Sequence, residues 1–158
     1  MIKVVLFDLD GTLLPMEQDM FMKAYMGTMA EKLAPYGYEP KTLAKAVWSG
    51  VNAMVMNDGS CSNEEAFWNT FCGILGEKAR EDAPIFEDYY RNEFQTVKHS
   101  CGFDERAKEV VRRLKEKGYR VVLATNPLFP SIATESRIKW AGLEPTDFEL
   151  FTTYEHYH

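Results

Sequence analysis

The chain has 158 residues and a formal net charge of −6, with 46% apolar and 27% charged residues. This length suits one hydrophobic core with a small additional unit, and the composition is that of an ordinary soluble globular protein. The acidic balance argues against nucleic acid as a partner, because proteins that bind a phosphate backbone usually carry a basic patch.

The first apolar segment is too short for a signal peptide or a membrane span, because Asp8 and Asp10 interrupt it. The cysteines are odd in number and have no metal-ligand spacing; they are Cys61, Cys72 and Cys101. This usage favours reduced thiols. We therefore expect a cytoplasmic protein with no membrane partner.

The first predicted element is a strand at residues 4–7, an uninterrupted apolar run typical of a strand buried on both faces of a parallel sheet. Two acids follow it, Asp8 and Asp10, and then Gly11 and Thr12. Ligands of open α/β sheets bind beyond the carboxyl ends of the strands. Side chains two residues apart in extended chain point to the same side. The two carboxylates are therefore placed to share a cation and a substrate.

A helical block is predicted from residue 17 to about residue 98, where apolar residues recur at three- and four-residue spacing. Turn residues at 37–40 and at 57–60 separate the first three helices. Ser62, followed three residues later by a glutamate, is a capping-box signature for the third helix. A fourth helix is expected over residues 85–97.

Methionines are frequent at the start of this block: Met16, Met20, Met22, Met26 and Met29. Flexible thioethers of this kind could line a substrate pocket. Their helical spacing is also that of ordinary packing, which is the interpretation we favour.

The remaining sequence alternates between helix and strand patterns. A helix is predicted over residues 104–117, a strand over 120–125, a helix over 131–140 and a short strand over 148–153. Together with the first strand, this alternation predicts an α/β fold with a doubly wound parallel sheet. The second strand ends in Thr125 and Asn126, which would make either an ordinary turn or a polar site beside the two acids.

The run Asp8-Leu9-Asp10-Gly11-Thr12, after its apolar strand, resembles the first motif of the haloacid dehalogenase-like (HAD) hydrolases, most of which are Mg²⁺-dependent phosphatases. Thr125 resembles the family's second motif, a Ser or Thr at the end of the second strand. This resemblance implies a HAD-like α/β core at residues 1–15 and 99–158. It implies a helical cap domain at residues 16–98.

The resemblance also implies roles for the acids in hydrolysis of a small phosphorylated metabolite. Asp8 would be the nucleophile that forms an aspartyl-phosphate, and it would bind Mg²⁺. Asp10 would protonate the leaving group and then activate water, and its backbone carbonyl would also bind the metal. An acid at this second position separates phosphatases from the dehalogenases of the family.

The same resemblance implies which residues would hold the phosphoryl group. Leu9 and Asp10 would offer backbone amides, and Gly11 a backbone able to bend around phosphate. Thr125 would donate its hydroxyl, with the Asn126 amide beside it.

The sequence departs from the family where a lysine beyond the third strand, and acids after a fourth strand, would complete the site. Without a fourth strand, residues 4–7 would form an exposed apolar edge, which natural proteins avoid. We expect a truncated piece of a longer hydrolase, with weak or no turnover. A homodimer or strand exchange that covers this edge is an alternative.

Two other functions stay open at this point. One is a non-catalytic relative or fragment that only binds phosphate or Mg²⁺. The other is a phosphoryl-transferring mutase, which uses the same two acids and a similar cap, and which would need a sugar bisphosphate.

Overall fold

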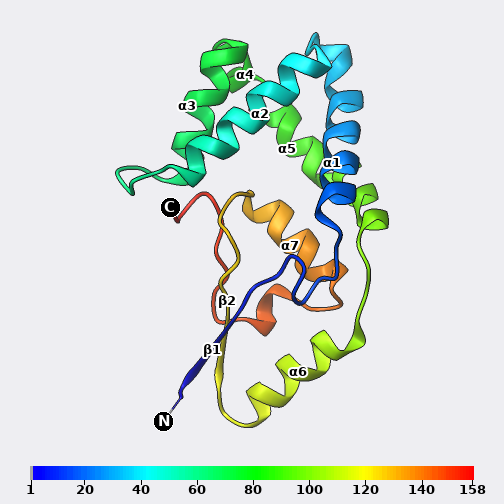
Figure 1. Cartoon of the computed structure of the whole chain (residues 1–158), viewed down its shortest axis with the longest axis vertical. Helices are drawn as coiled ribbons and strands as arrows, with labels where there is room; N and C mark the ends of the chain where they lie inside the picture. The colour runs from blue at the N-terminus through cyan, green and yellow to red at the C-terminus, as the bar shows by residue number, and fades with distance from the viewer. Residues whose placement is uncertain (1) are drawn as a thin grey trace.

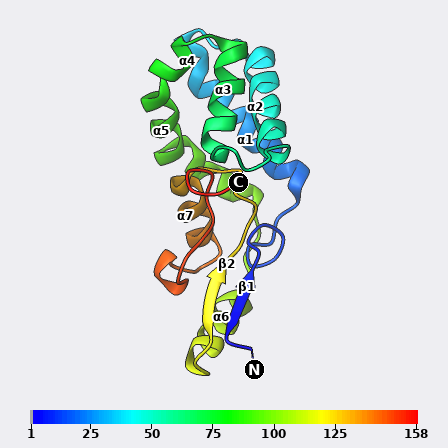
Figure 2. The same cartoon turned by 90° about the vertical axis from the view of Figure 1, so that its left-hand side faces the viewer.

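The computed structural model describes residues 2–158, and it is an α/β structure in which a small parallel sheet lies at one end of the molecule (Figure 1). The sheet pairs β1 (Val4–Phe7) with β2 (Arg120–Leu123). Two helices, α6 (Glu105–Glu116) and α7 (Ser131–Trp140), complete this α/β part. A bundle of helices, the helical part, is stacked on it along the long axis (Figure 2).

The sheet register brings the ends of β1 and β2 level, because Val4 pairs with Arg120 and Phe7 with Leu123 in parallel. The expectation that β1 is buried on both faces is wrong for Leu6, which is 64% exposed. Within residues 2–158, β1 has no strand on its other edge. The apolar edge predicted from the sequence is therefore open in this structure.

The predicted strand over residues 148–153 is reduced to one bridge. A 3₁₀ helix, η3 (Pro145–Asp147), leads into this segment, which runs parallel to β2. Leu123 bridges to Phe151, and the Leu123 amide donates to the Leu150 carbonyl (3.0 Å). The backbone hydrogen bonds to β2 extend only from Glu149 to Thr152, and the chain turns at Tyr154, so the pairing is short.

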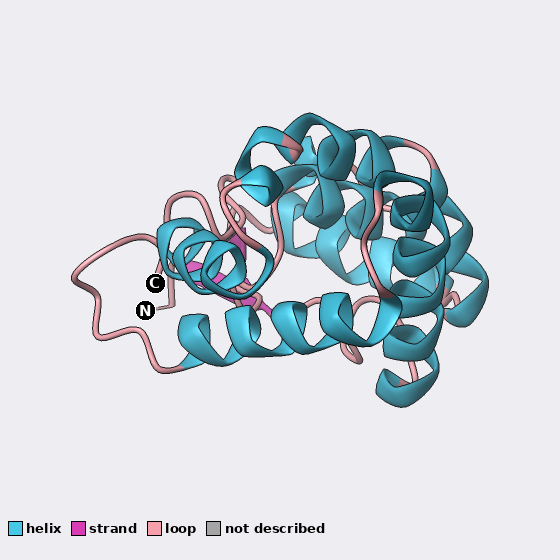
Figure 3. Ribbon diagram, turned by 90° about the horizontal axis from the view of Figure 1, so that it is seen from above, coloured by secondary structure: helices cyan, strands magenta, loops and turns pink. Residues whose placement is uncertain are grey.

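The helical part contains α-helices and two 3₁₀ helices, which dominate the view from above (Figure 3). In chain order they are α1 (Gln18–Leu33), η1 (Ala34–Tyr36), α2 (Pro40–Val55), α3 (Asn63–Leu75), α4 (Lys78–Glu81), α5 (Ala83–Arg91) and η2 (Glu93–Ser100). The predicted breaks after the first and second helices are confirmed. The capping box is confirmed as well, because Ser62 accepts from the Glu65 amide and the Glu65 carboxylate accepts from the Ser62 amide.

The fourth helix differs from the prediction of one element over residues 85–97. It begins earlier, at Ala83, with Pro84 in its first turn, where a missing N–H costs nothing. It ends at Arg91, because Asn92 has backbone angles outside the helical region (φ −113°, ψ −80°). The chain continues as the 3₁₀ helix η2.

The two connections between the parts lie side by side. Met16 and Cys101 form an antiparallel bridge, and the Gly102 amide donates to the Pro15 carbonyl (2.7 Å). The helical part therefore leaves the α/β part and returns to it at neighbouring points.

The buried side chains of both parts form one continuous apolar cluster, which reaches from Leu123 in the sheet to Leu43 in α2. Within the helical part, α2 and α3 approach closely where Gly50 faces the Phe67 ring. None of the helices in residues 2–158 combines the length and the apolar character needed to cross a membrane.

Candidate functional site

The first acid, Asp8, lies where the ends of the two strands meet. It follows Phe7 directly, and the Phe7 carbonyl accepts from the Ala124 amide just after β2 (2.7 Å). The Asp8 side chain is solvent-exposed, and its Oδ2 accepts a hydrogen bond from the Thr12 hydroxyl (3.1 Å). A fixed, accessible carboxylate at this point suits attack on a ligand or coordination of a cation.

The second acid, Asp10, is half-buried and forms an ion pair with Arg137 through Oδ2. Its other oxygen, Oδ1, is buried and has no hydrogen-bond partner within the described residues. Burial raises the pKa of Asp10 above its usual value, the Arg137 cation opposes this, and the Asp8 charge adds to it. The net direction is upward, so Asp10 keeps a proton to a higher pH than an ordinary aspartate.

Arg137, on α7, is a site residue that the sequence analysis missed. It is fully buried, and besides Asp10 it contacts the Thr134 hydroxyl (3.3 Å) and the Ala133 carbonyl (3.4 Å). Its guanidinium carbon lies 4.2 Å from the centre of the Phe129 ring, in a cation–π arrangement. No sequence signal marks it, because an arginine in a ten-residue helix is normally placed on the solvent face.

The loop after β1 leaves two amides available. The Leu9 carbonyl accepts from the amides of Thr12 and Leu14, and the Gly11 amide donates to the Leu14 carbonyl (2.8 Å). Gly11 has φ of +80°, which only glycine adopts readily, so it bends the loop. Among residues 2–158, no backbone carbonyl accepts from the amides of Leu9 and Asp10. The Leu9 side chain itself is buried in the core.

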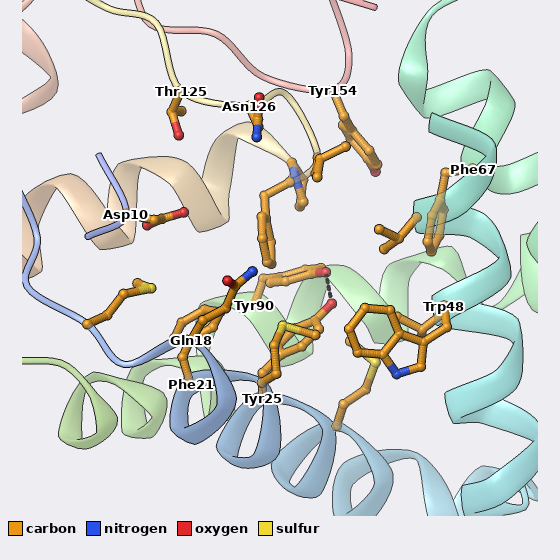
Figure 4. A pocket seen from close by; sticks show the side chains of 18 of the residues that line it. Asp10, Gln18, Phe21, Tyr25, Trp48, Phe67, Tyr90, Thr125, Asn126 and Tyr154 are labelled. Atoms are coloured by element: carbon orange, nitrogen blue, oxygen red, sulfur yellow. Dashed lines mark hydrogen bonds between the residues drawn. The ribbon is translucent and has the colours of Figure 1, made fainter. Parts of the chain in front are cut away.

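Thr125 and Asn126 lie across the opening from the acids. Thr125 is 4% exposed, and its carbonyl accepts from the Thr152 hydroxyl, which ties it to the neighbouring segment. Asn126 is exposed. Figure 4 shows both side chains directed toward the side of the cavity on which Asp10 lies.

These residues line one end of a cavity of about 420 Å³ between the two parts. Of the predicted site residues, the lining contains Asp8, Asp10, Gly11, Thr125 and Asn126. Its other end is aromatic, with Trp48 and Phe67 visible far from the acids in Figure 4.

Three of the methionines noted in the sequence, Met16, Met22 and Met29, also line the cavity. Met29 is buried and packs in the core as well, so the two interpretations of this run are not exclusive.

The site residues fit a divalent cation in part. The Asp8 carboxylate is accessible, and the Asp10 carbonyl accepts no hydrogen bond from the described backbone. Among residues 2–158 no cluster of three or more His, Cys, Asp or Glu side chains is arranged to hold a metal ion. Mg²⁺ is commonly bound by one or two protein carboxylates, with waters and substrate phosphate filling its other positions. Two oxygens are enough for that mode.

Comparison with known proteins supports the interpretation of these motifs. The family profile described as haloacid dehalogenase-like hydrolase matches residues 2–145. No curated protein matches the chain. The match covers both strands, the whole helical part and the segment that carries Arg137, and the two-stranded parallel sheet is an incomplete form of the sheet expected for this family. The chain belongs to the haloacid dehalogenase-like hydrolases.

Proposed function

We propose that this hydrolase is a Mg²⁺-dependent phosphatase that acts on a small phosphorylated molecule through an aspartyl-phosphate on Asp8. The observation that carries the proposal is the arrangement at the strand ends. An accessible carboxylate, a second acid with a raised pKa, two available amides and a buried threonine meet at one end of a cavity.

Asp8 is the nucleophile in this proposal. A carboxylate oxygen attacks phosphorus, the bond from phosphorus to the ester oxygen breaks, and an acyl phosphate forms. The Thr12 hydroxyl restrains the other carboxylate oxygen, which lowers the cost of orienting Asp8 for attack.

Asp10 carries the proton. In the first step it protonates the leaving oxygen, and in the second it accepts a proton from the water that hydrolyses the acyl phosphate. A raised pKa suits the first role, because a carboxyl group that holds its proton more tightly than an ordinary aspartate can deliver it to the leaving oxygen. Arg137 holds the Asp10 carboxylate in place and prevents its pKa from rising further.

The phosphoryl oxygens accept hydrogen bonds from the amides of Leu9 and Asp10, the Thr125 hydroxyl and the Asn126 amide. Because these donors are fixed in place, they need no reorganisation during the reaction. The Asp8 carboxylate and the Asp10 carbonyl would hold Mg²⁺. When bound, the metal neutralises charge on the phosphoryl oxygens.

In this proposal the α/β part at residues 1–15 and 99–158 is the catalytic core, and residues 16–98 form a cap domain. Its support is the position of the cavity between the two parts and the paired connections at Met16 and Cys101. Closure of the cap would exclude water and hold the leaving group. We place the protein in the cytoplasm, which the sequence favours.

The test compares the purified chain with Asp8→Asn and Asp10→Asn in Mg²⁺-dependent hydrolysis of acetyl phosphate, a small, reactive phosphoryl donor. We expect slow turnover by the unmodified chain, since the cavity lining within residues 2–158 contains no lysine or arginine. Asp8→Asn should lower it by about a thousandfold or more. Mass spectrometry of the chain quenched during turnover should locate a phosphoryl group on Asp8.

The matched control is Asp19→Asn, which removes an exposed acid in the first turn of α1, outside the cavity. It should retain the full rate. Equal rates for Asp8→Asn and the unmodified chain, phosphorylation at another residue, or neither turnover nor phosphorylation with Mg²⁺ present would overturn the proposal.

A further inference from the structure

The lining of the cavity away from the acids identifies the kind of ester it would accept. We infer that the leaving group is an uncharged, aromatic alcohol, so that the substrate is a phosphomonoester with one flat apolar group. This inference rests on the proposed phosphatase function and names its substrate class.

Aromatic side chains from both parts form a continuous wall along the cavity. Near the acids, the Phe129 ring lies against Arg137 and meets the Tyr25 ring edge-on, with centroids 5.6 Å apart. At the far end, Phe67 stacks on Phe71 at 5.1 Å. Stacked and edge-on rings at these distances are the arrangements that a further aromatic ring can join.

Trp48 is the most accessible member of this wall. It lines the cavity from α2 and is 52% exposed, so much of its ring lacks a protein partner. A flat ligand that reaches from Asp8 to Trp48 would remove this apolar surface from water, which is favourable in proportion to the area covered.

The charge of the lining excludes other leaving groups. Apart from Asp8 and Asp10 at one end, the side chains lining the cavity within residues 2–158 include no acid, lysine, arginine or histidine. A leaving group with a carboxylate or a second phosphate would be buried there without a cation, which is costly. This argues against the sugar bisphosphate that a mutase would need.

Two tyrosine hydroxyls of the wall are committed to each other. The Tyr25 and Tyr90 hydroxyls share a hydrogen bond (2.8 Å), drawn in Figure 4. Burial raises the pKa of Tyr90 to about 12, so this hydroxyl stays neutral at physiological pH. Beside Tyr25 and Tyr90, a sugar would compete with this hydrogen bond for its own partners, whereas an aromatic group needs none.

The reaction balances with water as the only co-reactant. The phosphorus–oxygen bond of the ester breaks, its electron pair stays on the ester oxygen, and Asp10 protonates that oxygen to give the aromatic alcohol. Water then releases orthophosphate from Asp8 and returns a proton to Asp10.

The test compares kcat/KM for phenethyl phosphate and glycerol phosphate, two alkyl esters of similar intrinsic reactivity, with acetyl phosphate as the donor that needs no aromatic wall. We expect phenethyl phosphate to be favoured by about a hundredfold. Trp48→Ala should lower the ratio of phenethyl phosphate to acetyl phosphate turnover by about tenfold. Val55→Ala, on the same helix, 64% exposed and outside the cavity, should leave both rates unchanged.

Calorimetric binding of phenethylphosphonate and methylphosphonate to the unmodified chain separates this inference from the proposed function. Tighter binding of phenethylphosphonate, lost in Trp48→Ala, supports the aromatic leaving group even if no ester is hydrolysed, in which case only the phosphatase proposal fails. Equal binding of the two phosphonates, or a preference for glycerol phosphate or a bisphosphate, would overturn the inference.

Discussion

The two ends of the cavity are built in different ways. The acid end comes from two short segments, residues 8–12 and residues 125–126, which two parallel strands bring to the same edge. The aromatic end gathers single side chains from α1, α2, α3 and α5 and from the loop after β2. The proposed catalytic groups therefore come from two short stretches of sequence, whereas the proposed aromatic subsite depends on how helices distant in sequence pack together.

This difference has a physical consequence for substitutions. The acid end depends on charges and hydrogen bonds, and removing one partner leaves the other without its compensating interaction, which is destabilising. The aromatic end depends on close packing, which is disturbed when the volume of a side chain changes. The substitutions below separate these two sensitivities.

The largest loss of stability is expected from Arg137→Met. This change leaves the half-buried Asp10 carboxylate without its cation and should lower the free energy of unfolding by about 3–5 kcal/mol. Urea unfolding followed by circular dichroism measures it. The control is Arg113→Met, which removes an exposed ion pair with Glu109 on α6 and should leave the unfolding midpoint in place. Equal midpoints for both variants would contradict a structural role for the buried pair.

Gly50→Ala tests the packing between α2 and α3. A Cβ atom at Gly50 would lie 2.5 Å from Phe67 Cδ2, so the Phe67 ring or one of the two helices must shift, at about 1–3 kcal/mol. Gly27→Ala in α1, where a Cβ atom meets nothing within 4 Å, should instead stabilise the chain by about 0.5–1 kcal/mol through helix propensity. Thermal unfolding of both variants gives the sign of each effect, and destabilisation of similar size in both would mean that close packing at Gly50 is not the cause.

A smaller effect is expected at the start of α3. Ser62→Ala removes the acceptor for the Glu65 amide and should lower the free energy of unfolding by about 1 kcal/mol. Ser62→Asp keeps an acceptor at the same position and should retain most of the stability. Chemical denaturation resolves this difference, and equal losses in the two variants would show that the hydrogen bond is not what matters.

The smallest change in stability, but a clear change in titration, is expected for Asp8→Asn. Because the Asp8 charge raises the pKa of Asp10, removing that charge should lower the pKa of Asp10. Arg137→Gln should raise it, since the opposing cation is lost. Carboxyl carbon shifts in an NMR titration report both directions, and a shift of the same sign in the two variants would refute the electrostatic account.

The raised pKa of Asp10 also determines how the stability of the fold changes with pH. The folded chain holds the Asp10 proton more tightly than the unfolded chain, whose value is near 3.8. The contribution of Asp10 to stability is therefore present in full below pH 3.8 and is lost as the pH rises through the folded value.

The sequence was sufficient for the parts of the structure that local patterns determine. The run after residue 7 predicted the acids at a strand end, Ser62 predicted a capped helix, and the helix over residues 131–140 has the predicted bounds. These features depend on neighbours within a few positions, so a single sequence can show them.

Features set by distant contacts were missed. Arg137 is held inside by Asp10, far away in sequence, and by the Phe129 ring from the loop just before α7. Residues 85–97 were expected to be one helix because their apolar residues recur at helical spacing. The α-helix instead ends before Asn92, whose backbone angles are not helical. The segment around Phe151 has a strand pattern, yet it pairs with β2 only from Glu149 to Thr152 and forms a single bridge.

The adjacent connections at Pro15–Met16 and Cys101–Gly102 also bear on how this architecture can vary. To the α/β part, the helical part is a single long loop whose two ends are already joined by a backbone bridge. The entropy of closing a loop grows only slowly with its length, so helices can be added, removed or replaced there at little cost to the sheet. The helical part can thus diverge in sequence and size while the acids after β1 keep their positions.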